Sequence, residues 1–139
     1  MTTFSNPAEL PALTLPILWD ILNQVLPDDT VNALVWWHLG YRPTGPGDSW
    51  ISTENVAPAW AENYPIAPDF IASRPATVQL TRSIPSEHKQ LLKDYLGFKG
   101  YSVNELMPRL TRRATMANWL LSVLASQGEL SEQPTPPNP

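Results

Sequence analysis

The chain has 139 residues, 42% hydrophobic side chains and a formal net charge of −4, which are typical of one globular domain with its own core. It contains no cysteine, which excludes disulfides, thiolate metal sites and thiol catalysis, and no apolar run approaches the roughly 20 residues of a membrane span. The N-terminus lacks the basic and apolar regions of a signal peptide, so we expect a cytoplasmic location, or a stromal one in plants.

The N-terminal part of the chain predicts two helices after a flexible lead over residues 1–12. The first helix has Thr14 as its N-cap and a broad apolar stripe, and we expect Pro27 to end it. Asp28 and Asp29 follow. Acidic side chains favour the positive end of a helix dipole, so a second helix is predicted to begin there.

Turn-forming residues dominate the chain after this second helix, which Gly40 is expected to end. The sequence RPTGPGD predicts a small β-hairpin over residues 41–52, and Ser52 is a candidate cap for a short helix through Trp60. Residues 77–84 then alternate apolar and polar side chains with a period of two. This period is typical of a strand, so we expect a strand there.

Helices resume in the C-terminal part of the chain. A third long helix is predicted over residues 85–96, with Gly97 as a left-handed terminator. A capping box at Ser102 predicts a short helix that Pro108 closes. The last helix, over residues 111–126, has the widest apolar arc and is therefore expected to lie at the centre of the fold.

Together these elements predict a mainly α fold. We expect a single compact helical domain over residues 13–127, with about three longer helices and two or three short ones. The hairpin near 41–52 and the strand near 77–84 are minor additions. Residues 128–139 form a Pro-rich tail that is predicted to be disordered.

Charge is sorted along the chain. Residues 1–70 contain one basic and eight acidic side chains, whereas residues 71–127 contain eight basic and three acidic ones. This separation indicates either a surface that attracts an anionic partner or two halves of the domain that attract each other. The basic side chains of the second half occupy residues 74–113, the basic segment: Arg74, Arg82, Lys89, Lys93, Lys99, Arg109, Arg112 and Arg113.

Three of these arginines surround the start of the last helix, where the helix dipole favours anions rather than cations. Arg113 falls within the apolar arc, so we expect it to be buried, with its guanidinium paired to an acid of residues 1–70 or to backbone carbonyls, because a buried unpaired charge is too costly. Arg109 and Arg112 lie toward the polar side and are expected to be exposed. With the other exposed bases they form the candidate partner- or anion-binding set: Arg74, Arg82, Lys89, Lys93, Lys99, Arg109 and Arg112.

No enzyme motif is visible in the sequence. There is no Gly-rich phosphate loop, no GxSxG and no HExxH, and His38 and His88 each lie on the apolar side of a predicted helix, where a hydrogen-bonded core role is more common than metal ligation. We therefore expect no metal, no cofactor and no catalytic residues. The six Trp indicate core filling, with an exposed aromatic docking patch as the alternative.

Two segments carry a resemblance to known proteins: VNALVWWHLGYR, and the long stretch from APDFIASRPATVQLTRS to RLTRRATMANWLLS. Over residues 14–125, and most specifically over 69–121, the chain resembles a family of small soluble proteins of unknown function from cyanobacteria and plastid-bearing plants. The resemblance implies a cytoplasmic or stromal protein and, by association, a role around the photosynthetic apparatus. It implies no functional residues.

The function predicted from these observations is non-catalytic. We expect a soluble binding, assembly or regulatory module whose basic segment meets an acidic protein partner. The alternative is a nucleic-acid-binding protein, because a short helix followed by a helix with a basic start resembles the helix-turn-helix plan. A pI of about 5.0 favours the first reading over this one. A third reading is an enzyme with an unrecognised site. The oligomeric state stays open.

Overall fold

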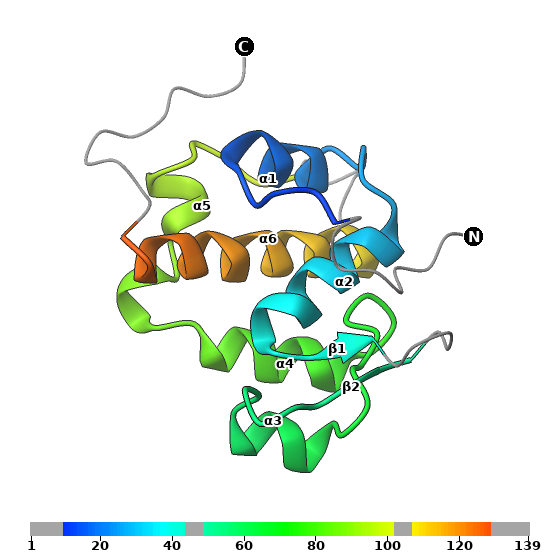
Figure 1. Cartoon of the computed structure of the whole chain (residues 1–139). Helices are drawn as coiled ribbons and strands as arrows, with labels where there is room; N and C mark the ends of the chain where they lie inside the picture. The colour runs from blue at the N-terminus through cyan, green and yellow to red at the C-terminus, as the bar shows by residue number, and fades with distance from the viewer. Residues whose placement is uncertain (1–9, 44–48, 102–106, 129–139) are drawn as a thin grey trace.

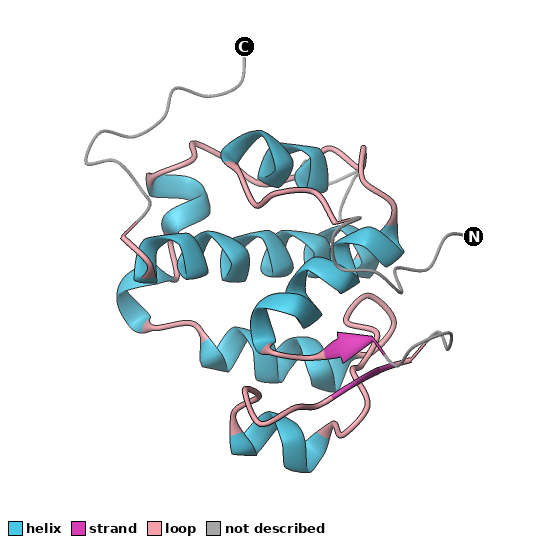
Figure 2. Cartoon of the chain, viewed as in Figure 1, coloured by secondary structure: helices cyan, strands magenta, loops and turns pink. Residues whose placement is uncertain are grey.

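The computed structural model describes residues 10–43, 49–101 and 107–128. Within these ranges the fold is mainly α, with a single two-stranded antiparallel sheet, as the sequence predicts (Figure 2). The elements in chain order are α1 (Leu15–Leu22), α2 (Asp28–Leu39), β1 (Arg42–Pro43), β2 (Trp50–Ile51), α3 (Pro58–Asn63), α4 (Arg74–Ser83), the 3-10 helix η2 (Ser86–His88), α5 (Leu91–Asp94) and α6 (Pro108–Ser126).

Helix α6 is the centre of the domain, and α1, α2, α4 and α5 all pack against it (Figure 1). It begins at Pro108, earlier than predicted, because proline is well suited to the first helical position. Leu120 and Leu121 are fully buried, as the wide apolar arc predicts for a central helix. The six Trp are buried or half-buried against this core, which matches core filling rather than an exposed docking patch.

The first helix is shorter than predicted. Thr14 is its N-cap, with the side-chain Oγ1 accepting from the backbone N–H of Ile17, but α1 ends at Leu22 rather than at Pro27. Gln24 takes a left-handed conformation with φ of 62°, and the chain turns there toward α2. The prediction failed because helix propensity alone does not mark a turn at a non-Gly residue. The α1–α2 turn matters below because its carbonyls face α6.

The predicted hairpin over 41–52 is present. Arg42 pairs with Ile51 and Pro43 with Trp50 in antiparallel register, and residues 44–48 lie outside the described part of the chain. The short helix that follows, α3, begins at Pro58 instead of being capped by Ser52.

The strand predicted over 77–84 is wrong, because this segment belongs to helix α4. Ser73 caps the helix, and Oγ1 of Thr77 and of Thr81 each donates to the carbonyl four residues earlier, at 3.0 Å in both cases. These bonds satisfy the hydroxyls within the helix, so β-branched residues are tolerated there. Burial of Thr77 and Leu80 against the core then outweighs their strand propensity.

The long helix predicted over 85–96 is divided into η2 and α5. The buried side chain of Asn118 explains the division. Its Oδ1 accepts from the backbone N–H of Leu92 at 3.1 Å, and its Nδ2 donates to the carbonyl of His88 at 3.3 Å. These bonds satisfy main-chain groups at the break, so α6 stabilises an interrupted helix. The short helix predicted at 102–107 falls almost wholly on residues 102–106, outside the described residues.

The two ends of the chain, residues 1–9 and 129–139, also lie outside the described residues. Leu10, which falls within the lead predicted over residues 1–12, is half-buried and packs against the core together with Leu13. Among the described helices, none has both the length and the hydropathy required to cross a membrane.

Two helix ends rely on glycine, and substitution there has a predictable cost. Gly40 and Gly97 have φ of 110° and 84°, as expected for left-handed terminators. Gly97→Ala should lower the free energy of unfolding by roughly 1–2 kcal/mol through backbone strain. Gly40→Ala should cost more, because its Cβ would lie 2.9 Å from the backbone carbonyl carbon of Asn55. Urea denaturation of both variants checks this order, and equal losses would contradict it.

Candidate functional site

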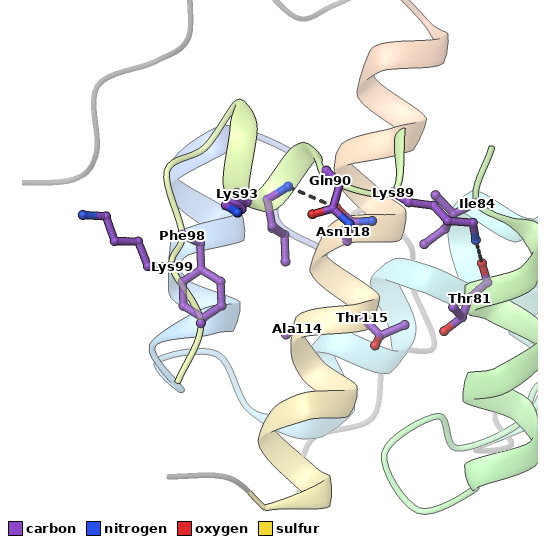
Figure 3. Close-up of a pocket in the computed structure, with 12 residues that line it drawn as sticks. Thr81, Ile84, Lys89, Gln90, Lys93, Phe98, Lys99, Ala114, Thr115 and Asn118 are labelled. Atoms are coloured by element: carbon purple, nitrogen blue, oxygen red, sulfur yellow. Dashed lines mark hydrogen bonds between the residues drawn. The ribbon is translucent and has the colours of Figure 1, made fainter. Parts of the chain in front are cut away.

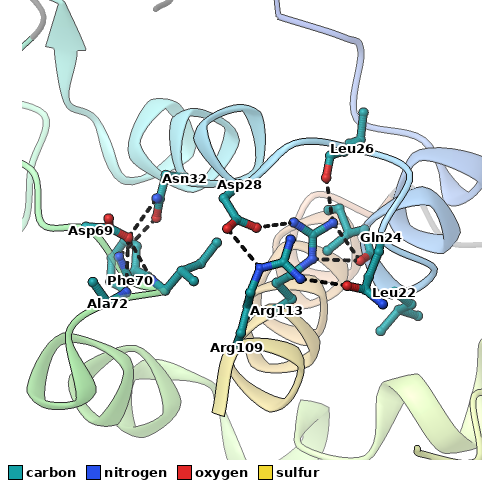
Figure 4. Close-up of polar contacts among 12 residues, drawn as sticks. Leu22, Gln24, Leu26, Asp28, Asn32, Asp69, Phe70, Ala72, Arg109 and Arg113 are labelled. Atoms are coloured by element: carbon teal, nitrogen blue, oxygen red, sulfur yellow. Dashed lines mark hydrogen bonds and ion pairs between the residues drawn. The ribbon is translucent and has the colours of Figure 1, made fainter. Parts of the chain in front are cut away.

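The basic segment separates into two groups of side chains in the folded domain. Arg109 and Arg113 reach the α1–α2 turn and bind Asp28 (Figure 4). These are the ion pairs within the described part of the chain. Most of the remaining basic side chains line two adjoining pockets on the other side of α6. The first group therefore joins the two halves of the domain, and the second is available to a ligand.

Arg113 is fully buried, in keeping with its place on the apolar arc. Its Nη1 donates to Oδ1 of Asp28 at 2.6 Å. Nε and Nη2 donate to the carbonyl of Ile21 at 3.1 and 3.0 Å, and Nη2 also donates to the carbonyl of Leu26 at 2.7 Å. The guanidinium thus donates to two carbonyls of the α1–α2 turn, that of Leu26 and that of Ile21, which also accepts from the backbone N–H of Gln24 at 3.3 Å. Its role in this arrangement is structural.

Arg109 does not match the expectation of a free, partner-binding side chain. Its Nε donates to Oδ2 of Asp28 at 3.0 Å, and its Nη1 donates to Oε1 of Gln24 at 2.6 Å, although the side chain is 45% exposed. The two oxygens of Asp28 serve the two arginines separately, which explains how one acid can hold both. We therefore remove Arg109 from the candidate binding set.

The two arginines determine the electrostatics of the Asp28 carboxylate. Partial burial opposes its ionisation, but the hydrogen bonds and positive charges of Arg109 and Arg113 outweigh this and hold its pKa below the usual 3.8. A carboxylate with a lowered pKa in the folded state stabilises the fold at any pH above its unfolded pKa.

Acid should therefore weaken the domain through Asp28. Its contribution to the free energy of unfolding is complete above pH 3.8 and should be lost as pH falls through the lower pKa of the folded state. Asp28→Asn should lower stability at pH 7 and flatten its dependence on pH between 4 and 2. Urea denaturation at several pH values measures this, with Asp94→Asn as a control on an exposed acid. Equal slopes for the variant and the wild type would contradict the assignment.

A groove runs along the side of α6 opposite the α1–α2 turn, between α4 and the η2–α5 region. It consists of two open pockets of about 450 and 490 Å³ that meet at Thr81 and Thr115. Figure 3 shows Ala114 and Thr115 on α6, with Phe98 on one side and Thr81 on the other. We call this feature the basic groove, for the side chains that surround it.

Each pocket has its own cations. Lys89, Lys93 and Lys99 line the first, the lysine pocket, and Arg74 and Arg112 line the second, the arginine pocket. No Asp or Glu is found among the described residues that line either pocket. The groove therefore presents one sign of charge, which concentrates anions at its surface.

The floor of the groove is largely apolar. Ala114, Leu92 and Phe98 contribute carbon surface to the lysine pocket, and Val78 does so in the arginine pocket. The threonine hydroxyls that line it, such as that of Thr81, donate to carbonyls of their own helices. A ligand would therefore meet apolar surface and methyl groups at the bottom and positive charge at the rim.

Two of the basic side chains of the groove already donate hydrogen bonds to backbone carbonyls. Nζ of Lys89 donates to the carbonyl of Thr81 at 2.7 Å, and Nη1 of Arg112 donates to the carbonyl of Ile71 at 2.8 Å. Both keep further donors available, because an ammonium has three and a guanidinium five. Arg82 is exposed but lines neither pocket, so it leaves the candidate set.

The sequence could have indicated the groove through one signal that was missed. Thr77 and Thr81, like Thr111 and Thr115, are spaced by four residues, which places each pair on one face of a helix. Interpreting 77–84 as a strand concealed the first pair. The arginine pocket lies at the start of α4 and α6 and the lysine pocket further along both, so the two helices run parallel (Figure 1).

The described residues contain no cluster of side chains suited to holding a metal ion. No group of three or more His, Asp or Glu side chains among them could hold a metal ion. His88 Nδ1 lies 2.8 Å from Oγ of Ser122, but Ser122 is buried and lines none of the pockets described above. This pair holds η2 against α6.

Comparison with known proteins gives the family but no activity. A protein whose solution NMR structure is known is 58% identical to this chain, with a TM-score of 0.73 and coverage of 85% of this chain and 98% of that one. No curated protein matches the chain. A family model described as a domain of unknown function fits residues 12–125. Because this match spans most of the domain, the chain belongs to that family, DUF1823.

Proposed function

We propose that this protein is a non-catalytic binding module and that its basic groove binds an acidic segment of a partner protein. The observation that carries the proposal is the clustering of five cations around a groove with no carboxylate among its described lining residues. By contrast, the two arginines that stabilise the fold, Arg109 and Arg113, are both paired with the carboxylate of Asp28.

The composition of the groove favours a peptide over a nucleic acid. Single-stranded nucleic acids bind by stacking bases on aromatic side chains, and Phe98 is the one aromatic side chain among the described lining residues. Its ring already packs edge-on against Trp19 and Tyr101, with centroid distances of 6.1 and 5.1 Å. A floor of aliphatic surface with a cationic rim suits a segment that combines apolar and acidic side chains.

The helix-turn-helix alternative also loses its recognition surface. That reading needs the first residues of α6 to be free to contact DNA. Arg113 is fully buried, and Arg109 binds Asp28 and Gln24. Of the three arginines, Arg112 lines one of the two pockets, and Arg109, although 45% exposed, is held by its ion pair. This observation favours the protein-binding proposal.

The resemblance to proteins of oxygenic photosynthetic lineages extends the proposal. On this basis we propose that the partner takes part in assembly or regulation of the photosynthetic apparatus, and that the complex forms in the cytoplasm, or in the stroma of plastids.

Charge reversal in the groove should abolish binding of an acidic peptide. We expect the triple variant Lys89→Glu, Lys93→Glu, Lys99→Glu to weaken binding of a fluorescein-labelled peptide of alternating Glu and Leu by at least about tenfold in low salt. Fluorescence anisotropy measures the dissociation constant. The salt dependence of binding should fall with it, because fewer charges are then paired.

Arg82→Glu is the control for the single variant Lys93→Glu, because each changes the net charge by the same amount and Arg82 is an exposed cation of the same segment outside both pockets. Arg82→Glu should bind the peptide within about twofold of the wild type, and Lys93→Glu should bind it more weakly. Equal losses in the two single variants would reduce the interaction to net charge and remove the groove from the proposal. A labelled oligothymidine that binds more tightly than the peptide would favour the nucleic-acid reading instead.

A further inference from the structure

The basic groove has internal geometry that net charge does not explain. Its two pockets have nearly equal volumes, about 450 and 490 Å³, and are adjacent, with Thr81 and Thr115 lining both. Each is open to solvent and large enough for one bulky apolar side chain, whereas a helix, with a diameter of ~10–12 Å, would lie above both. Two adjacent pockets of this size therefore suit two side chains of an extended chain.

The spacing of the pockets can be estimated from α6. The residues of α6 that line the lysine pocket run from Ala114 to Asn118, and those that line the arginine pocket run from Pro108 to Thr115, so the midpoints of the two sets are four to five residues apart along the helix. At a rise of about 1.5 Å per residue this offset is ~7 Å. In an extended chain, side chains two positions apart point the same way and are ~6.6–6.8 Å apart. The two distances agree.

We infer that the basic groove reads a short extended motif in which two apolar side chains alternate with acidic ones. The apolar side chains enter the two pockets, one beside Ala114 and the other beside Val78, and the acidic residues face the cationic rim. The inference rests on the proposed function, because it assumes an acidic protein segment as occupant. It adds the pattern that such a segment must have.

Charge complementarity at both ends of the motif supports this occupant. Lys93 and Lys99 line the lysine pocket, and Arg74 and Arg112 line the arginine pocket. Lys89 reaches Thr81, where the two pockets meet, so acids before, between and after the apolar pair each have a cation nearby. A purely acidic segment would leave the apolar floor hydrated, and a purely apolar one would leave the cations without partners.

Three peptides of identical composition and charge test the pattern on the wild-type protein. Their sequences are Glu-Leu-Asp-Leu-Glu, Glu-Leu-Leu-Asp-Glu and Leu-Glu-Asp-Glu-Leu, each acetylated and amidated and carrying the same label. The first should bind about tenfold more tightly than the second, because the adjacent leucines of the second point to opposite sides and only one is buried. It should also bind more tightly than the third. Equal affinities, or the third peptide binding best, would overturn the inference.

Pocket-filling variants separate this inference from the proposed function. Ala114→Leu and Val78→Phe fill the lysine and the arginine pocket without changing any charge. Each should remove most of the preference for the first peptide, and Ala59→Leu on the exposed surface of α3 should leave it unchanged. Thermal melts confirm that each variant is folded. Unchanged affinities in both filled variants, with the lysine triple variant still losing binding, would overturn the motif and leave the proposed function intact.

Discussion

Replacing Arg113 with alanine should lower the free energy of unfolding by about 2–4 kcal/mol. The substitution removes a fully buried guanidinium, leaves the carbonyl of Leu26 without its side-chain donor, and leaves that of Ile21 with its backbone donor, the N–H of Gln24. This expected loss is smaller than that for breaking a fully buried ion pair, because Asp28 is 38% exposed and keeps Arg109 as a partner. Asp28 therefore does not become an isolated buried charge. Urea denaturation followed by Trp fluorescence measures the loss.

The neighbouring arginines provide the comparison. Arg109→Ala should cost no more than about 1 kcal/mol, because exposed ion pairs contribute little. Arg112→Ala should cost about as much as one hydrogen bond, about 0.5–1.5 kcal/mol. Equal losses at the three positions would mean that Arg113 has no special structural role.

Leu121→Ala should destabilise the domain by roughly 2–5 kcal/mol, the cost of truncating a buried leucine. Leu121 is fully buried in α6, the helix against which most of the other helices pack, so the cavity would form where several elements meet. Thermal unfolding followed by circular dichroism measures the effect.

Val123→Ala is the control for Leu121→Ala, because Val123 lies in the same helix and is only half-buried. It should cost clearly less. A loss below about 1 kcal/mol for Leu121→Ala would mean that α6 relaxes to fill the space and is not the rigid centre of the fold.

Much of the fold could be predicted because its determinants are local. Thr14 caps α1, Gly40 ends α2 with positive φ, Gly97 takes a positive φ in the turn after α5, and the turn-rich RPTGPGD sequence connects the two strands of the hairpin. The wide apolar arc predicted that α6 is central. Each of these signals acts within a few residues of the chain, which is why the sequence alone carries them.

The errors have a common cause in contacts between distant residues. The break between η2 and α5 depends on Asn118, which lies more than 20 residues away and satisfies backbone groups at the break. The strand predicted over 77–84 failed because burial of Leu80 and of its neighbours against α6 decides for a helix. Nothing near either segment in the sequence records these contacts.

The candidate site, like the fold, could be predicted where the signal is local and not where it depends on contacts between distant residues. The apolar arc and the cost of an unpaired charge place Arg113 in the interior, but its partner, Asp28, lies 85 residues away, and its oxygens are shared with Arg109. The basic groove depends on α4 and α6 running parallel. The distribution of charge along the sequence predicted a cationic surface, but which of the basic side chains lie together depends on the fold.

Amide chemical-shift mapping with the peptide Glu-Leu-Asp-Leu-Glu tests the central claim most directly. Solution NMR has yielded the structure of a protein 58% identical to this one, so the method suits the domain. We predict that the largest shifts occur at Thr81, Ala114 and Thr115 and disappear in the lysine triple variant. Shifts centred instead on the α1–α2 turn or the β-hairpin, or no shifts at all, would contradict the assignment of the basic groove as the binding site.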